Sequence, residues 1–384
     1  MSTLPYVPAV QPATRSRWIE WISVTFLVYL LLTAVGAIGD GFKIASAGRA
    51  EALFTFASNP LIALIIGIVA TSLIQSSSTV TSIIVGMVAG GMPISIAIPM
   101  AMGANIGTSL TSTIVSLGHI RDGEEFRRAF SAATVHDSFN LLAVVILLPV
   151  ELLFGPLEKA SAAASSLLVS ESSGQLSSFN PLGAMLAPAS DALGKSVSWI
   201  PGIWSGIILI IIGIVLILFV VKAIARVLQK VMVGRARDIM HRTLGRGPIS
   251  GMSAGGIITV LVQSSSTTTA LIVPMAGSGL FSLKQVYPFT LGGNVGTTIT
   301  ALLAAMAISG PLAVLALQIA LVHLFFNLFA IILIYSIPLL RNIPVLMAEY
   351  LAKLAQRNKA YVVAYITGVF FLVPLTILGI ARFF

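Results

Sequence analysis

The stretch GIVATSLIQSSSTVT at residues 67–81 returns almost unchanged as GGIITVLVQSSSTTT at residues 255–269. In both copies an apolar run meets one glutamine, three serines and a threonine, and then turns apolar again. Each apolar half holds only about 13–15 residues, whereas about 20 are needed to cross the hydrocarbon core of a bilayer. We therefore predict two re-entrant helical hairpins, at about 60–91 and 249–279, each with QSSS at its tip.

The composition is that of a membrane protein. Charged residues make up 9% of the 384 residues and hydrophobic residues 57%, whereas a soluble domain carries about 25% charged residues. This balance excludes a disordered chain, a nucleic-acid-binding protein and most soluble enzymes. The absence of cysteine excludes a disulfide framework, a zinc–thiolate site and a cysteine nucleophile. Seven apolar segments are long enough to span a bilayer, at 18–38, 94–117, 129–153, 201–221, 283–306, 312–337 and 361–381.

The basic residues predict how these spans are oriented. Four of the segments outside the spans hold 16 Lys and Arg, and the other two hold only four. The four basic segments are 1–17, 119–128, 222–248 and 339–360, and the other two are 39–59 and 154–200. Because cytoplasmic loops are enriched in Lys and Arg, the basic group is expected inside. The N-terminus is then cytoplasmic and the C-terminus external, in a multi-pass protein of the plasma (inner) membrane.

Two further motifs repeat in the same order as the first. GANIGTS at 103–109 matches GGNVGTT at 292–298, and VHDSFN at 135–140 matches VHLFFN at 322–327. The offsets of the three motifs are 188, 189 and 187 residues, which indicates an internal repeat. The first hairpin follows a weakly charged segment and the second follows the basic block, so the repeats have inverted topology, as in secondary transporters.

The predicted fold is an all-α polytopic membrane protein with two inverted-topology repeats. Each repeat contains a re-entrant hairpin and an unwound transmembrane helix, because its glycine motif interrupts an apolar span. The predicted parts are a cytoplasmic tail at 1–17, repeat one at 18–153, an external Ser-rich linker at 154–200, repeat two at 201–337, and an amphipathic segment with the last transmembrane helix at 338–384.

The two tips have the chemistry of an oxyanion site. A helix that begins at each tip would offer free N–H groups and the positive end of its dipole, and serine hydroxyls would add donors. The alternative is that these small residues only pack helix against helix. The candidate anion-binding residues are Gln75, Ser76, Ser77, Ser78, Thr79, Gln263, Ser264, Ser265, Ser266 and Thr267.

The glycine motifs and one acid suggest a cation site. Unwound carbonyls with Asn and Thr oxygens suit a hard monovalent cation such as Na⁺, which is the interpretation favoured here. The alternative is that the motifs are kinks for tight packing, with each Asn hydrogen-bonded to a neighbour. Asp137 is the one acid well inside a predicted span, and its matched position is Leu324. Such a carboxylate is best neutralised by a bound cation; the alternative is a protonated, hydrogen-bonded Asp. The candidate cation ligands are Asp137, Gln75, Asn105, Thr108, Ser109, Gln263, Asn294, Thr297 and Thr298.

The repeated His-Asn pairs have a supporting role in this prediction. His136 and His323 are interpreted as buried imidazoles that orient Asn140 and Asn327, one turn later on the same helix. The alternative is a direct role for the histidines as cation ligands or in a proton relay.

These motifs resemble the type II sodium-dependent phosphate cotransporter family, in its bacterial form. The resemblance covers about residues 60–335 and rests on QSSSTVT, QSSSTTT, GANIGTS, GGNVGTT and RRAFSAATVHDSFN at 127–140. It implies Na⁺-coupled import of inorganic phosphate, with phosphate between the two QSSS tips and no organic cofactor. It also implies that Asp137 belongs to a sodium site that makes transport electrogenic, with three Na⁺ for each HPO₄²⁻.

The implied partners are inorganic phosphate, Na⁺ and the lipid bilayer, with no nucleic acid; a homodimer is left open. The chain departs from animal members in its external loop, which is short and lacks a cysteine pair. Two other functions compete with this interpretation. One is Na⁺-coupled transport of another small anion, and the other is an intramembrane serine hydrolase that uses His136 and a QSSS serine, against which no G-x-S-x-G motif is present.

Overall fold

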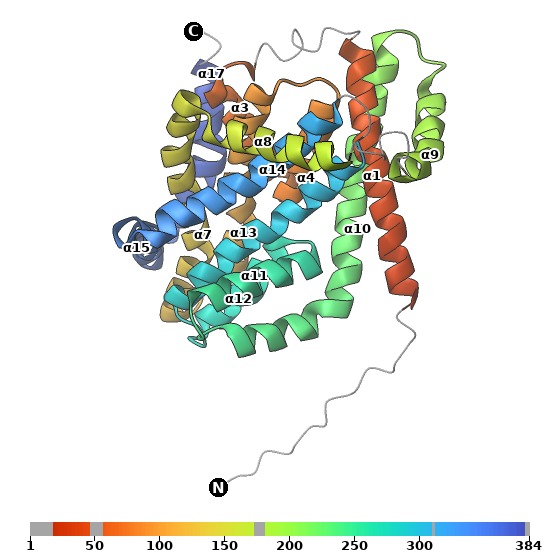
Figure 1. The fold of residues 1–384 in the computed structure, drawn as a ribbon. Coiled ribbons are helices and arrows are strands. Elements are labelled where there is room, and N and C mark those ends of the chain that lie inside the picture. Colours follow the sequence, from red (N-terminus) through yellow and green to blue (C-terminus); the bar gives the residue numbers. More distant parts are fainter. Residues whose placement is uncertain (1–17, 47–56, 173–180, 309–311, 381–384) are drawn as a thin grey trace.

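The computed structural model describes residues 18–46, 57–172, 181–308 and 312–380, and all regular secondary structure within these ranges is helical (Figure 1). The predicted tail at 1–17 lies outside the described residues. Seven helical segments in the described ranges are long and apolar enough to cross a membrane. They are Trp18–Ser46, Ile94–His119, Gly123–Phe154, Ile203–Met232, Leu283–Met306, Ala313–Tyr335 and Ala360–Ile380. Each overlaps one predicted span, so the all-helical fold with seven candidate spans is confirmed.

The elements follow one another in a simple order. They are α1 (Trp18–Ser46), α3 (Pro60–Ile74), α4 (Ser77–Ala89), α5 (Ile94–Ile106), η2 (Gly107–Ser109), α6 (Leu110–Ser116), η3 (Leu117–His119), α7 (Gly123–Phe154), α8 (Pro156–Ser172), α9 (Pro181–Val197), α10 (Ile203–Thr243), α11 (Pro248–Val262), α12 (Ser265–Gly277), α13 (Leu283–Met306), α14 (Ala313–Ala330), η4 (Ile331–Tyr335), α15 (Pro338–Arg357), α16 (Ala360–Thr367), η5 (Gly368–Leu372) and α17 (Val373–Ile380).

Both QSSST motifs break an apolar segment into two short helices at the same place. The helices α3 and α11 have 15 residues each, and α4 and α12 have 13. The break is a glutamine in the left-handed region, with φ 59° at Gln75 and 53° at Gln263. These are the only non-glycine residues with positive φ in the described ranges. The serine that follows each glutamine caps the next helix, so identical sequences form identical junctions.

Glycines let the first helix of each pair lie directly against the helix that carries the glycine motif. A Cβ on Gly107 would meet the Ile68 carbonyl oxygen at 2.6 Å, and one on Gly296 would meet the Gly256 carbonyl oxygen at 2.7 Å. Thus α3 packs on α5 and η2, and α11 packs on α13, through backbone-to-backbone contact that larger residues would prevent.

The two halves also interlock. The helix α4 packs against α13 and α14, whereas α12 packs against α6 and α7. Each helix that begins at a QSSST motif therefore rests on two helices of the other half. One is the His-Asn helix, and the other carries the glycine motif (α13) or directly follows it (α6). The long helices α1 and α10 run side by side at one side of the molecule (Figure 1).

One predicted feature of the fold was wrong. The second glycine motif does not unwind its helix, because Leu283–Met306 is continuous, while the first is interrupted only by a 3-10 turn at Gly107–Ser109. The glycines there serve close packing, which needs no break. The Ser-rich linker 154–200 contains two helices, α8 and α9. Glu151 helps start α8, since its carboxylate accepts from the backbone N–H groups of Leu157 at 2.7 Å and Glu158 at 3.0 Å.

The C-terminal part folds back onto the first half. The helix α15 is amphipathic, as predicted for 343–358: it buries Ala348, Ala352 and Ala355 and leaves Leu339 and Leu346 exposed. It packs along α7, and the last helical segments η5 and α17 contact α3.

Candidate functional site

The QSSST serines have two different roles. Ser76 accepts a hydrogen bond from the Thr79 backbone N–H at 3.3 Å and from the Thr79 hydroxyl at 2.8 Å. Ser264 and Thr267 repeat this arrangement at 3.2 and 3.0 Å. The first serine and the threonine of each motif therefore cap the helix. The Ser77 hydroxyl is buried and has no hydrogen-bond partner among the described residues, so it is the serine best placed to take a ligand.

The two motifs lie next to each other. The Ser266 hydroxyl at the start of α12 donates to the Gln75 carbonyl oxygen at the end of α3, at 3.5 Å. Ser78 and Thr79 are buried beside Ser77, and Ser265 is buried in the second copy. The N-terminus of α12 thus lies against the junction at which α4 begins. N–H groups in the first turn of a helix that its cap does not use can bind an anion at such a place.

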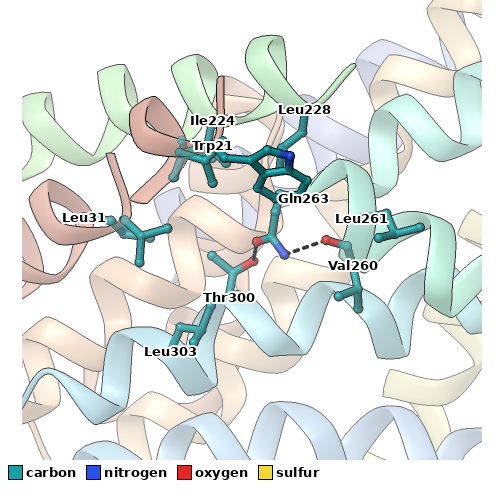
Figure 2. A pocket seen from close by; sticks show the side chains of 12 residues that line it. Trp21, Leu31, Ile224, Leu228, Val260, Leu261, Gln263, Thr300 and Leu303 are labelled. Carbon is teal, nitrogen blue, oxygen red and sulfur yellow. Dashed lines mark hydrogen bonds between the residues drawn. The ribbon is translucent and has the colours of Figure 1, made fainter. Parts of the chain in front are cut away.

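The motif glutamines are held by threonines that were not predicted from the sequence. The Thr111 hydroxyl donates to Gln75 Oε1 at 3.4 Å, and the Thr300 hydroxyl donates to Gln263 Oε1 at 2.9 Å. The two threonines are 189 residues apart, so extending the repeat alignment past the glycine motif would have found them. Figure 2 shows Gln263 bound to Thr300 and, through Nε2, to the Val260 carbonyl oxygen at 2.8 Å.

Gln263 projects into a pocket of about 200 Å³ between α1, α10, α11 and α13. Trp21, Ile224, Leu228 and Leu303 provide its apolar walls (Figure 2). The helix α10 also contacts this QSSST motif through a hydrogen bond, in which Gln229 Nε2 donates to the Thr267 hydroxyl at 2.7 Å. Sequence inspection missed Gln229 because nothing in the basic block distinguishes it.

The histidines cross-link the two halves reciprocally. His136 bonds through Nε2 to Asn294 Oδ1, and His323 Nε2 lies 3.2 Å from Asn105 Oδ1. Each histidine therefore bonds the asparagine in the glycine motif of the other half. All four side chains are buried. This supports the interpretation of the histidines as orienting groups, although the asparagines they orient include Asn294 and Asn105, not only those one turn away.

Asn140 joins this network and makes it asymmetric. Its amide nitrogen donates to the Asn105 carbonyl oxygen at 2.8 Å, and its oxygen accepts from Asn294 Nδ2 at 2.7 Å. Its counterpart Asn327 instead donates to the His323 carbonyl oxygen at 2.8 Å. His136, held by Asn294 in this network, does not match the role of base that a serine hydrolase would give it.

The threonines of the glycine motifs bond their own helices. Thr108 donates to the Ala104 carbonyl oxygen at 3.2 Å, Thr297 to Gly293 at 2.9 Å, and Thr298 to Val295 at 2.7 Å. Each hydroxyl oxygen keeps lone pairs with which it could contact a cation. The side chain of Ser109 lies outside the described residues.

Asp137 is buried on α7, with 4% of its surface exposed. Its Oδ2 accepts a hydrogen bond from the Tyr365 hydroxyl at 2.7 Å, and its Oδ1 has no partner among the described residues. Its neighbour His136 faces the central network, whereas Asp137 lines a cavity of about 290 Å³ beside α15 and α16. In the described ranges no three His, Cys, Asp or Glu gather as ligands for a divalent metal.

Comparisons of the sequence with a family model and with individual proteins both find sodium-dependent phosphate transporters. Residues 30–168 and 216–337 match the family described as Na+/Pi-cotransporter. The sodium-dependent phosphate transport protein 2B of Homo sapiens is 31% identical over 92% of this chain and 64% of its own length. Protein 2A of Rattus norvegicus is 32% identical over 92% of this chain and 66% of its own length. The chain thus spans slightly less than two thirds of these relatives, and no solved structure matches it.

Proposed function

Because the chain belongs to the Na⁺/Pi-cotransporter family, a family of multi-pass membrane transporters and not of enzymes, we propose that it imports inorganic phosphate together with Na⁺ across the plasma membrane. The observation that carries this proposal is the contact between the two QSSST motifs, in which the Ser266 hydroxyl at the start of α12 donates to the Gln75 carbonyl oxygen at the end of α3, at 3.5 Å. A doubled motif whose copies meet at one place is suited to binding a single small anion from two sides.

The fold supports transport by alternating access between two inverted repeats. The paired helices of 15 and 13 residues are shorter than the roughly 20 residues a span needs, as expected for re-entrant hairpins. Each half packs the second helix of its pair on the other half, and the His-Asn bonds cross between halves in both directions. Two halves with equivalent contacts can exchange conformations, which opens the central site to each side in turn.

Phosphate binds between the tips in this proposal. The donors are the free first-turn N–H groups of α4 and α12 together with the Ser77 and Ser265 hydroxyls. No Lys or Arg occurs at 60–91 or 249–279, so neutral donors and co-bound cations hold the anion. Neutral donors in a buried site still discriminate, because an anion that cannot satisfy them leaves polar groups unpaired.

Sodium binds in this proposal to oxygen atoms of the repeated motifs and of Asp137. The proposed ligands are Asp137, Gln75, Asn105, Thr108, Ser109, Gln263, Asn294, Thr297 and Thr298. Three Na⁺ with one HPO₄²⁻ carry one net positive charge inward. A membrane potential of 100 mV then contributes about 2.3 kcal/mol to each cycle.

The test is uptake of radiolabelled phosphate into proteoliposomes under an inward Na⁺ gradient, with K⁺ in its place as the control. We expect uptake only with Na⁺, and we expect unlabelled phosphate and arsenate to compete better than sulfate, which lacks the proton that HPO₄²⁻ donates. Ser77→Ala should lower uptake, whereas Ser82→Ala, whose hydroxyl bonds the Ser78 carbonyl oxygen within α4, should not. Equal competition by sulfate would redirect the proposal to another anion, and uptake in K⁺ would end it.

A further inference from the structure

We propose that Tyr365, in the last candidate membrane span (Ala360–Ile380), is a positioning residue for the Asp137 carboxylate. The last span then takes part in coupling Na⁺ to phosphate transport. The inference rests on the proposed function, since it assumes that Asp137 is a sodium ligand. It also extends that function beyond the repeats. The family match ends at residue 337, and Tyr365 lies in α16, outside both matched regions.

The contact is specific and buried. The Tyr365 hydroxyl donates to Asp137 Oδ2 at 2.7 Å, between residues 228 positions apart in the chain. The second carboxylate oxygen, Oδ1, is buried without a partner in the described ranges. The Tyr365 hydroxyl therefore fixes the orientation of the carboxylate through Oδ2 and leaves Oδ1 for a further ligand such as Na⁺. The adjoining cavity of about 290 Å³ has a polar side formed by Asp137, Ser138, Tyr350 and Tyr365, and its volume is enough for a cation with water there. Its other walls are apolar and are formed by Ile106, Leu141, Met347, Leu351, Val369 and Phe370.

The Tyr365 ring is held in place from two sides. It packs edge-on against Phe130 of α7, with ring centroids 6.4 Å apart, and against Phe370, at 5.8 Å. The start of the same segment is fixed to α7 as well, because the Lys359 ammonium lies 3.5 Å from the centre of the Phe126 ring. These contacts determine where the hydroxyl lies, so the ring can stay while the hydroxyl alone is removed.

The second half lacks both members of this pair. The position matched to Asp137 is Leu324, which lines an apolar cavity of about 600 Å³ together with Val295 and Leu328. The last segment instead contacts the first half, through η5 and α17 against α3. The acid that breaks the repeat symmetry is thus covered by a segment that does not belong to the repeats.

The test compares Tyr365→Phe with Tyr361→Phe, the same change at an exposed residue one turn earlier in α16. Loss of a hydrogen bond to a charged group should raise the Na⁺ concentration for half-maximal phosphate uptake about tenfold. The maximal rate at saturating Na⁺ should stay close to wild type. An unchanged Na⁺ dependence in Tyr365→Phe, or an equal shift in Tyr361→Phe, would overturn the proposal.

A double-mutant cycle tests whether Tyr365 acts through Asp137. In the Asp137→Gly background, Tyr365→Phe should add no further shift, because the carboxylate that accepts the Tyr365 hydrogen bond is absent. A full additional shift would show that the tyrosine acts elsewhere.

A measurement without transport separates this inference from the proposed function. The midpoint of thermal unfolding in detergent should rise in NaCl relative to KCl for wild type and Tyr361→Phe, and rise less for Tyr365→Phe and Asp137→Asn. Wild-type protein that shows this Na⁺ effect but no phosphate uptake would refute the proposed function and leave the positioning role supported. A Tyr365→Phe protein that fails to fold even in KCl would make the hydroxyl structural and refute the positioning role.

Discussion

Substitution of Gly296 by alanine tests whether the glycine motifs serve close helix packing. A Cβ at this position would lie 2.7 Å from the Gly256 carbonyl oxygen and 2.8 Å from the Thr259 Cβ. Both atoms belong to α11 and neither is the far end of a flexible side chain, so the helices must separate. Overpacking of this kind costs about 1–3 kcal/mol, and it outweighs the gain of about 1 kcal/mol in helix propensity from Gly to Ala.

The assay is thermal unfolding of the purified protein in detergent. The matched control is Gly379→Ala in α17, where a Cβ would meet nothing within 4 Å, so the control should be neutral or slightly stabilised. Gly296→Ala should unfold at a lower temperature than both wild type and the control. Equal unfolding temperatures for the two variants would refute the packing argument.

Three further predictions follow from the site and the fold. Asp137→Gly should still take up phosphate but without the associated current, and an unchanged current recorded in membranes that contain this variant would contradict its role in charge coupling. His323→Ala should reduce uptake because it leaves the buried Asn105 Oδ1 unpaired at a cost of about 1–3 kcal/mol; uptake equal to wild type at matched expression would show that the bond is dispensable. Glu151→Gln should lower the unfolding temperature, since the charged cap accepts two N–H groups of α8 and such caps contribute about 0.5–2 kcal/mol; no shift in the melting curve would mean that α8 needs no cap.

The spans and the helix breaks could be predicted because they follow from local chemistry. Apolar runs of sufficient length form helices in a membrane, and a serine N-cap after a polar glutamine ends one helix and begins the next. The two QSSST motifs form the same junction for this reason, with left-handed Gln75 and Gln263. The helices α8 and α9 were missed because a high serine content suggests a loop, whereas alanine between the serines favours a helix.

The partners within the site could not be predicted from local patterns. His136 was expected to orient Asn140, one turn away, and its Nε2 does lie 3.4 Å from Asn140 Nδ2, but it also bonds Asn294, which is 158 positions distant. Two glycines beside an asparagine fit an unwound segment and a tightly packed helix equally well, and only the neighbouring helix distinguishes them. Tyr365 had no motif around it, so its contact with Asp137 depends entirely on how α15 returns the chain to α7.

The central claim is that phosphate and Na⁺ cross together with net inward charge. Simultaneous uptake of radiolabelled Na⁺ and phosphate into the same proteoliposomes tests it most directly, with the membrane potential set at zero or negative inside. The account predicts three Na⁺ for each phosphate and faster uptake of both at the negative potential. Entry of phosphate without Na⁺ would contradict it. Uptake of two Na⁺ for each phosphate, at a rate independent of the membrane potential, would also contradict it.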